Sequence, residues 1–196
     1  MKETMNKPII LCIYFILVET VPSQDHWETA IYADDVWSYV IPESELPSEW
    51  NTLDFDDSAW LSGPGGIGYG DGDDGTEISP AISVYLRRVF TVSDTANLIS
   101  AILHADYDDG FVAYLNGFEI GRSSNLGAPG TFVSFDGATN GDHEAQLYQG
   151  GYPDAHALDS LQLSSLLITG NNVLAVQVHN VSFNSSDISS NFFLSF

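Results

Sequence analysis

Short apolar runs, separated by Gly, Asp and Asn, dominate this sequence and restrict its fold most strongly. In the clearest run, Ser83–Val92, apolar residues recur at every second position, and only Arg88 interrupts the apolar face. Residues 173–179 alternate in the same way, and the chain closes on Phe192, Leu194 and Phe196. A period of two is typical of half-buried β-strands, so these runs predict strands.

Turn-forming residues divide the apolar runs. Residues 98–105 and 111–115 flank Asp106-Tyr107-Asp108-Asp109-Gly110, whose Asp and Gly residues favour a turn, and this pattern predicts a hairpin. Asn116-Gly117 then separates residues 111–115 from 118–120. Asn-Gly is the strongest short signal for a two-residue turn, so a second hairpin is expected there.

One segment has helical character, and two have no periodic pattern. The leucines of residues 158–168 fit neither period well, so we expect one turn or a short helix before Gly170. Residues 63–77 and 127–143 are rich in Gly and Asp and predict long connections. Many short strands with little helix predict an all-β fold, a two-sheet antiparallel β-sandwich.

The N-terminus carries an export pattern. Lys2 and Lys7 precede an apolar stretch of ten residues, 9–18, which is about 15 Å long as a helix and too short for a hydrocarbon core of about 30 Å. We therefore predict a signal peptide over residues 1–23, a single domain over residues 24–196, and a secreted or cell-surface protein without stable membrane insertion. An uncleaved short anchor is the alternative. Cys12 lies inside the signal, so the mature chain has no thiol or disulfide.

The charge balance limits the partners. The formal net charge is −22, and the mature part carries only Arg87, Arg88 and Arg122 as cationic side chains besides histidines. A surface this acidic repels phosphate backbones and anionic lipids, so nucleic acid is not expected as a ligand. Neutral sugars, cations and basic partners remain compatible with it, and so does a purely solubilising role.

Several strings resemble the galactose-binding-like jelly-roll family. They are Asp54-Phe55-Asp56-Asp57-Ser58-Ala59-Trp60, Tyr85-Leu86-Arg87-Arg88-Val89-Phe90, Asp108-Asp109-Gly110 with Tyr114-Leu115-Asn116-Gly117, and Gly170-Asn171-Asn172-Val173-Leu174-Ala175-Val176, in order over residues 37–196. The resemblance implies a jelly-roll sandwich that frequently holds a structural Ca²⁺. It also implies an accessory module of secreted glycoside hydrolases or other surface proteins, which binds sugar in some members and only packs against a catalytic domain in others.

The strings also have a structural interpretation. Asp56-Asp57-Ser58 is typical of a turn in which side-chain oxygens accept backbone N–H groups. Trp60 is expected to anchor this turn by burying its indole, with sugar stacking as the alternative. At least one of Arg87 and Arg88 is expected to pair with a carboxylate.

Residues 63–77 form the most unusual segment, GPGGIGYGDGDDGTE. Its glycines allow close backbone approach, and its acidic side chains offer the oxygen ligands that Ca²⁺ prefers, so the candidate metal ligands are Asp71, Asp73, Asp74 and Glu77. The spacing does not match an EF-hand loop. A solvated acidic loop without metal is the alternative interpretation.

The sequence gives little support to a catalytic site. Asp106, Asp108 and Asp109 could suggest a pair of glycosidase carboxylates, but neighbouring carboxylates at a strand end point in different directions. The chain has no Gly-x-Ser-x-Gly elbow and no zinc-type histidine spacing. The sequence therefore predicts a non-catalytic protein.

The predicted function is a non-catalytic carbohydrate-binding module whose partner is a glycan or polysaccharide. The aromatic residues Tyr107, Tyr148 and Tyr152 are candidate stacking platforms, together with Trp60. The alternative is a structural or interaction module that packs against a neighbouring catalytic domain, which the strand-like end at Phe196 would favour. Two N-glycosylation patterns, Asn180-Val181-Ser182 and Asn184-Ser185-Ser186, are present.

Overall fold

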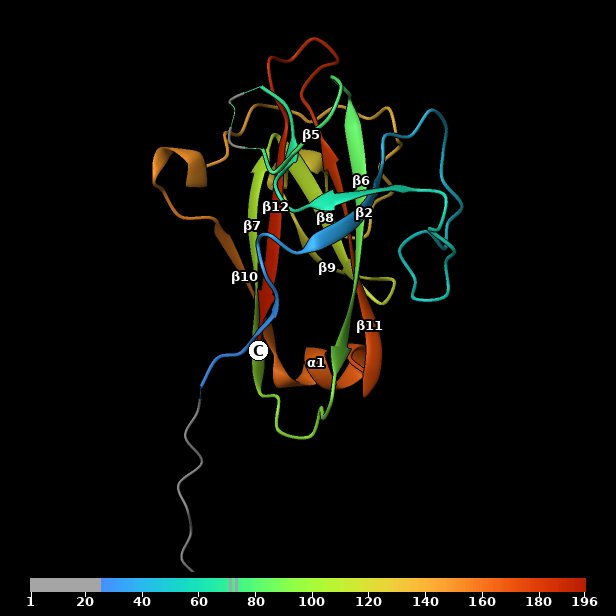
Figure 1. The fold of residues 1–196 in the computed structure, drawn as a ribbon, viewed down its shortest axis with the longest axis vertical. Helices are drawn as coiled ribbons and strands as arrows, with labels where there is room; N and C mark the ends of the chain where they lie inside the picture. The colour runs from blue at the N-terminus through green and yellow to red at the C-terminus, as the bar shows by residue number, and fades with distance from the viewer. Residues whose placement is uncertain (1–25, 71, 73) are drawn as a thin grey trace, which may run out of the picture.

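The computed structural model describes residues 26–70, 72 and 74–196, so the predicted signal peptide lies outside the described residues. Two antiparallel sheets pack face to face, with the short helix α1 at one end (Figure 1). The four-stranded sheet has the order β1 (Thr29–Ile31), β12 (Ser189–Ser195), β7 (Ser100–Asp108) and β10 (Asp154–Asp159). The six-stranded sheet has the order β3 (Leu61–Pro64), β2 (Val36–Val40), β6 (Ser83–Val92), β11 (Gly170–His179), β8 (Gly110–Leu115) and β9 (Phe118–Arg122). The predicted two-sheet antiparallel sandwich is confirmed.

The period-two patterns define the core between the sheets. Val84 and Leu86 of β6 face Val176 and Val178 across the register with β11, and all four side chains belong to the main core cluster. Phe192 and Leu194 of β12 point into the same core from the opposite sheet. Each strand that alternates in the sequence therefore contributes its apolar face to one shared interior.

The connection between β7 and β8 differs from the predicted hairpin. β7 pairs with β10 and β12 in the four-stranded sheet, whereas β8 pairs with β9 and β11 in the six-stranded sheet. The hairpin prediction at residues 106–110 was therefore wrong: Asp109 lies where the chain crosses from one sheet to the other. Turn-forming residues indicate a change of direction, but they do not indicate whether the next strand joins the same sheet.

The second hairpin and the short helix are confirmed. Leu115 and Phe118 pair across the turn, and both Asn116 and Gly117 adopt positive φ angles, 50° and 89°. The helix α1 (Ser160–Leu166) begins at Asp159, whose carboxylate accepts hydrogen bonds from two backbone N–H groups of the first turn. Gln162 completes the capping box. No helix in the described part of the chain has the length and apolar character needed to cross a bilayer.

A second, smaller apolar cluster covers the outer face of the six-stranded sheet. Its buried members are Trp50, Tyr85 and Ala175, and loop residues such as Phe55 and Trp60 pack around them. Residues 41–60 and 127–137 supply most of this cover, which explains why these long connections are ordered without regular structure.

The Gly-rich segment contains the small parallel pair β4 (Ile67–Gly68) and β5 (Thr76–Glu77). Gly66, Gly70 and Gly72 have positive φ angles, and a Cβ atom at Gly68 would collide with the carbonyl of Ile188. The predicted close backbone approach is confirmed, and it places this segment against the residues that lead into β12.

Candidate functional site

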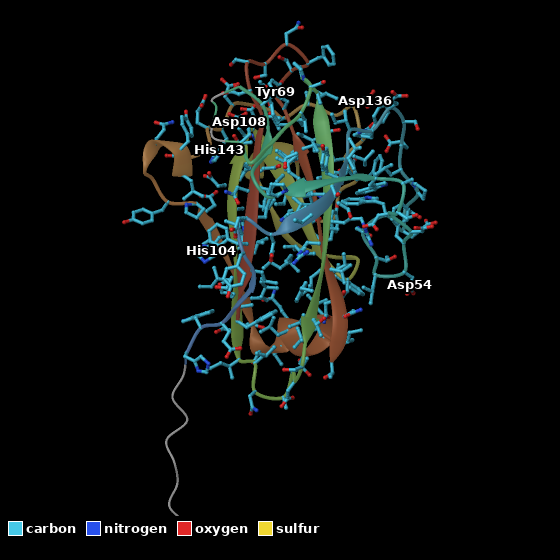
Figure 2. The ribbon with its side chains drawn as sticks, viewed as in Figure 1. Asp54, Tyr69, His104, Asp108, Asp136 and His143 are labelled. Carbon is cyan, nitrogen blue, oxygen red and sulfur yellow. The ribbon has the colours of Figure 1, made fainter. Side chains whose placement is uncertain are left out.

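Three carboxylates meet at the end of the sandwich opposite α1. One oxygen from each of Asp108, Glu144 and Asp187 lies within 4.8 Å of the others, and we refer to these residues as the acidic triad. Asp108 is buried, Asp187 is half-buried and Glu144 is exposed. Figure 2 shows Asp108 at this end beside Tyr69 and His143. An all-oxygen cluster of this kind can hold a hard cation such as Ca²⁺.

The two aspartates that flank Tyr107 and Asp108 hold the segment that carries Glu144. Asp106 Oδ1 accepts a hydrogen bond from the backbone N–H of Gln146 at 2.7 Å. Asp109 Oδ1 accepts one from His143 N–H at 2.9 Å, and its Oδ2 accepts one from Val181 N–H at 2.7 Å. These carboxylates are buried but satisfied by backbone donors, so they fix the position of residues 143–147 over β7.

Asp187 is positioned by contacts on the other side of the triad. Tyr69 and Ile188 form an antiparallel bridge with two backbone hydrogen bonds of 3.0 Å, and Asn180 Nδ2 donates to the Asp187 carbonyl at 2.8 Å. Burial raises the pKa of the Tyr69 hydroxyl, and the negative charges of Asp187 and Asp108 raise it further. The Tyr69 phenol is therefore neutral and borders the triad.

The three arginines form ion pairs with carboxylates outside the triad. Arg87 pairs with Asp57 at 2.9 Å, Arg88 with Asp35 at 3.1 Å, and Arg122 with Glu119 at 2.9 Å. The prediction that Arg87 or Arg88 would pair with a carboxylate is confirmed for both. Apart from these three arginines, the described part of the chain has no lysine or arginine.

A polar hollow of about 270 Å³ lies next to the triad. Tyr107 and His143 form one wall, and their rings stack at 4.1 Å between centroids. Serine, asparagine, glycine and aspartate residues from 123–125 and 140–142 line the rest. The Tyr107 hydroxyl donates to Asp154 Oδ2 at 3.0 Å, and burial together with the charge of Asp154 raises its pKa. Tyr107 is 4% exposed, so the faces of its ring are covered by other parts of the protein.

A second hollow, of about 150 Å³, opens on the outer face of the six-stranded sheet, and we call it the aromatic hollow. Its lining consists of Glu45, Leu46, Ser48, Trp50, Asn51, Tyr85, Tyr114, Phe132, Val133 and Gln177. Trp50 lies edge-on to Tyr85 and Tyr114, with centroid distances of 4.7 and 5.6 Å. Phe132 is 80% exposed at the rim.

Polar groups accompany the aromatic rings of this hollow. Gln177 Nε2 donates to the Tyr114 hydroxyl at 2.9 Å. Glu45 Oε1 accepts hydrogen bonds from Ser134 Oγ at 2.6 Å and from Phe135 N–H at 3.1 Å, and so ties the rim to the loop beside Phe132. The hollow therefore combines aromatic surface with hydrogen-bonding groups.

The aromatic residues predicted from the sequence are not gathered in one place. Trp60 is half-buried and packs edge-on against Phe55 at 5.7 Å, while Ser58 N–H donates to Asp56 Oδ1 at 3.0 Å in the predicted turn. Tyr148 and Tyr152 are 40% and 89% exposed on the segment that follows the triad residue Glu144. Neither they nor Trp60 line the two hollows.

The predicted metal ligands of the Gly-rich segment have different environments. Asp71 and Asp73 lie outside the described residues, Glu77 is exposed, and the Asp74 carboxylate packs against Gly68. The sequence patterns did not predict the triad, because its members come from three segments that are distant along the chain. Glu144 and Asp187 also lie in loops, where no periodic pattern marks them.

No protein-family model matches this sequence, and no curated protein is similar to it at a significant level. Solved structures do match it. A β-glucuronidase from an uncultured Clostridium sp. is 15% identical, with a TM-score of 0.53 over 88% of this chain and 29% of that one. A Bacteroides uniformis β-glucuronidase is 16% identical, with a TM-score of 0.51 over 87% of this chain and 18% of that one.

A third structure, a β-glucuronidase from glycoside hydrolase family 2, is 14% identical, with a TM-score of 0.50 over 89% of this chain and 18% of that one. At these identities the similarity is one of fold. The chain spans less than a third of the length of each of these proteins. It therefore resembles one β-sandwich domain within larger glycoside hydrolases.

Proposed function

We propose that this chain is a non-catalytic carbohydrate-binding domain and that its glycan binds in the aromatic hollow. The observation that carries this proposal is the exposed ring of Phe132 at the rim of a hollow whose walls include Tyr114 and Trp50. Aromatic faces stack on the apolar faces of pyranose rings, and a few polar groups then fix the orientation of the sugar.

The two hollows differ in how well they suit this role. In the polar hollow, the Tyr107 ring is stacked on His143 and is not available to a sugar. In the aromatic hollow, Phe132 is open to solvent, and Gln177 and Asn51 lie beside it as hydrogen-bonding partners. This contrast favours the aromatic hollow over the tyrosines that the sequence suggested.

The size of the hollow limits the ligand. Its volume of about 150 Å³ is below the range of about 300–1,000 Å³ that is usual for drug-sized ligands. We therefore expect it to hold one sugar ring or the end of a chain. Glu45 at the rim disfavours uronic acids and sulfated sugars, so a neutral terminal sugar is the expected ligand.

The test is a titration with methyl glycosides of neutral hexoses, in which binding is measured by calorimetry and by tryptophan fluorescence. Trp50 lies in the hollow, so binding there should change its emission. Phe132→Ala should weaken binding about two- to tenfold, because the loss of one stacked ring is worth roughly 0.5–1.5 kcal/mol. Since Phe132 is exposed, the variant should fold as well as the unchanged protein.

Phe118→Ala is the matched control, because Phe118 is 61% exposed on the β8–β9 hairpin and does not line the hollow. Its affinity should equal that of the unchanged protein. If no neutral sugar binds, or if Phe132→Ala and Phe118→Ala bind a sugar equally well, the aromatic hollow is not the glycan site.

The proposal that this domain is non-catalytic rests on the hydrogen bonds that its buried aspartates make. Asp106 and Asp109 both accept backbone hydrogen bonds and are not poised as an acid and base pair. A catalytic neighbour in the same protein is part of the proposal, because the structurally similar chains are much longer. Exposed apolar residues at the α1 end, Ile99, Leu161 and Ile168, offer a contact surface for it. The full coding sequence tests this role: a catalytic domain in the same reading frame would support it, and a product without such a domain would contradict it.

Export is the remaining part of the proposal. The basic residues and the apolar stretch of residues 1–23 support secretion or surface display. N-terminal sequencing of the protein from its native host should then give a start near Gln24. A protein that retains Met1 and stays in the cytoplasm would contradict it.

A further inference from the structure

We propose that the acidic triad of Asp108, Glu144 and Asp187 binds a structural Ca²⁺ ion. This site is different from the Gly-rich loop that the sequence suggested, although the two adjoin each other. It is also independent of the aromatic hollow, which lies on the outer face of the other sheet.

The donor set favours Ca²⁺ among the common cations. The triad offers only carboxylate oxygens, within 4.8 Å of one another. The nearest histidine in the sequence, His143, has its ring stacked on Tyr107 and its Nδ1 hydrogen-bonded to the Tyr107 carbonyl at 3.0 Å. A hard all-oxygen set suits Ca²⁺ or Mg²⁺ rather than Zn²⁺. Ligands from one strand and two loops suit the irregular coordination of Ca²⁺ better than the strict octahedron of Mg²⁺.

A buried hydroxyl beside the triad is the second and independent observation. Ser189 of β12 is the register partner of Asp108 in β7, and cross-strand partners point to the same face of a sheet. The next residue of β12 confirms this geometry. Ser190 points to the opposite, inner face of the sheet, where its hydroxyl donates to the Ile67 carbonyl. Ser189 is 6% exposed, and its Oγ has no hydrogen-bond partner among the described residues.

A buried hydroxyl without a hydrogen-bond partner loses its contacts with water and gains none in return, and therefore requires an explanation. Asn180 repeats the pattern: it is 0% exposed, its Nδ2 donates to the Asp187 carbonyl, and its Oδ1 has no partner in the described part of the chain. Both orphaned atoms are oxygens, and both adjoin triad residues. A cation at this place would attract them, directly or through its bound water.

The local charge supports the same assignment. Three carboxylates held close together repel one another, and each of the arginines is paired with a different carboxylate elsewhere. A divalent ion would offset most of this repulsion. It would also join the ends of β7 and β12 to residues 142–147, which lack regular structure of their own apart from the start of the 3₁₀ turn Leu147–Gln149.

The first test is a thermal melt of the whole mature chain in chelator, in millimolar Ca²⁺ and in millimolar Mg²⁺. Ca²⁺ should raise the melting temperature by several degrees, increasingly so above its Kd, and Mg²⁺ should have a smaller effect. Direct binding is measured by Tb³⁺ luminescence excited through tyrosine, since Tyr69 and Tyr107 adjoin the triad, with displacement by Ca²⁺. Equal melting temperatures in chelator and in Ca²⁺ would overturn the proposal.

Single substitutions of acidic residues test where the ion binds. Glu144→Gln alters an exposed side chain, so it should fold, but it should raise the half-saturating Ca²⁺ concentration about tenfold or more. Asp187→Asn should act in the same direction. Asp142→Asn, two residues before Glu144 and also exposed, and Glu77→Gln, in the Gly-rich loop, are the controls and should bind as the unchanged protein does. Calcium stabilisation that survives Glu144→Gln and is lost in Glu77→Gln would place the ion in the loop and refute the triad.

Discussion

The guanidinium of Arg87 on β6 donates from Nε to Asp57 Oδ2 at 2.9 Å and thereby fastens a loop to the outer face of the six-stranded sheet. The Arg87 side chain is almost fully buried. Its other nitrogens donate to the carbonyls of Trp50, Thr52 and Phe55. One side chain on a strand therefore orders most of the loop that lines the aromatic hollow. This contact joins Arg87 to the acidic, Trp-containing string of residues 54–60, which is about thirty residues away in the sequence.

Replacing Arg87 with Lys should destabilise the domain by about 3 kcal/mol. Lysine keeps the charge but cannot supply the planar fork, so several buried carbonyls and Asp57 lose donors. The measurement is the urea midpoint, with tryptophan emission as the signal. Arg88→Lys is the control, because Arg88 is 31% exposed and bonds only to Asp35 and the Val36 carbonyl, and it should cost less than about 1 kcal/mol. Equal midpoints for the two variants would show that Arg87 does not fasten the loop.

Replacing Asp109 with Asn should loosen the segment over the triad. The carboxylate accepts one hydrogen bond on each oxygen, from His143 and from Val181, and an amide has only one oxygen to offer. The loss of one buried acceptor should cost about 1–3 kcal/mol. Hydrogen exchange should quicken at the backbone amides of His143 and Val181. Asp142→Asn, which changes an exposed residue nearby, should leave these amides protected, and unchanged exchange in Asp109→Asn would contradict the anchoring role.

The sequence predicted those parts of the fold that depend on local patterns. The strand Ser83–Val92 has the predicted bounds because its apolar residues recur with a period of two. The turn at Asn116-Gly117 forms because both residues tolerate positive φ. The crossing at Asp109 was missed, because turn residues carry no information about which sheet the next strand joins.

The candidate sites were harder to predict, because both depend on contacts between distant segments. Glu144 reaches Asp108 only because Asp106 and Asp109 bind the backbone around it. Tyr85 and Tyr114 face the aromatic hollow because loops fold over the outer face of the sheet. Neither arrangement leaves a periodic trace in the sequence, whereas the acidic Gly-rich loop is conspicuous in the sequence because its acidic residues are adjacent.

Stability should fall as the pH is lowered from about 6.5 to about 4, in part because of His179. Burial lowers the pKa of this imidazole to about 4 from its ordinary 6.5, and its Nδ1 donates to the Gly137 carbonyl at 2.8 Å. The unfolded chain therefore binds a proton at a higher pH than the native protein does. The contribution of His179 to the free energy of unfolding is fully present above the pKa of histidine in the unfolded chain. Below that pH it decreases until the pKa of His179 in the folded protein is reached, by an amount on the order of 3 kcal/mol.

The His179 contribution can be separated from that of the carboxylates. Urea midpoints are measured at about pH 7, pH 5 and pH 4 for the unchanged protein and for His179→Gln. The variant should be less stable at neutral pH, but its stability should depend less steeply on pH. Parallel curves for the two proteins would show that His179 does not titrate in this way.

Only one of the two N-glycosylation patterns should be used in a host that glycosylates exported proteins. Asn184 is exposed, whereas Asn180 is 0% exposed, and its Nδ2, the atom that would carry the glycan, donates to the Tyr69 hydroxyl at 3.1 Å and to the Asp187 carbonyl at 2.8 Å. A glycan on Asn180 would break both bonds, so folded protein should carry a single glycan on Asn184. Intact mass before and after enzymatic deglycosylation measures this number. Asn184→Gln should abolish the mass shift, and Ser182→Ala, which removes only the Asn180 pattern, should leave it unchanged. A glycopeptide that carries sugar on Asn180 in folded, secreted protein would show that the buried amide is not required by the fold.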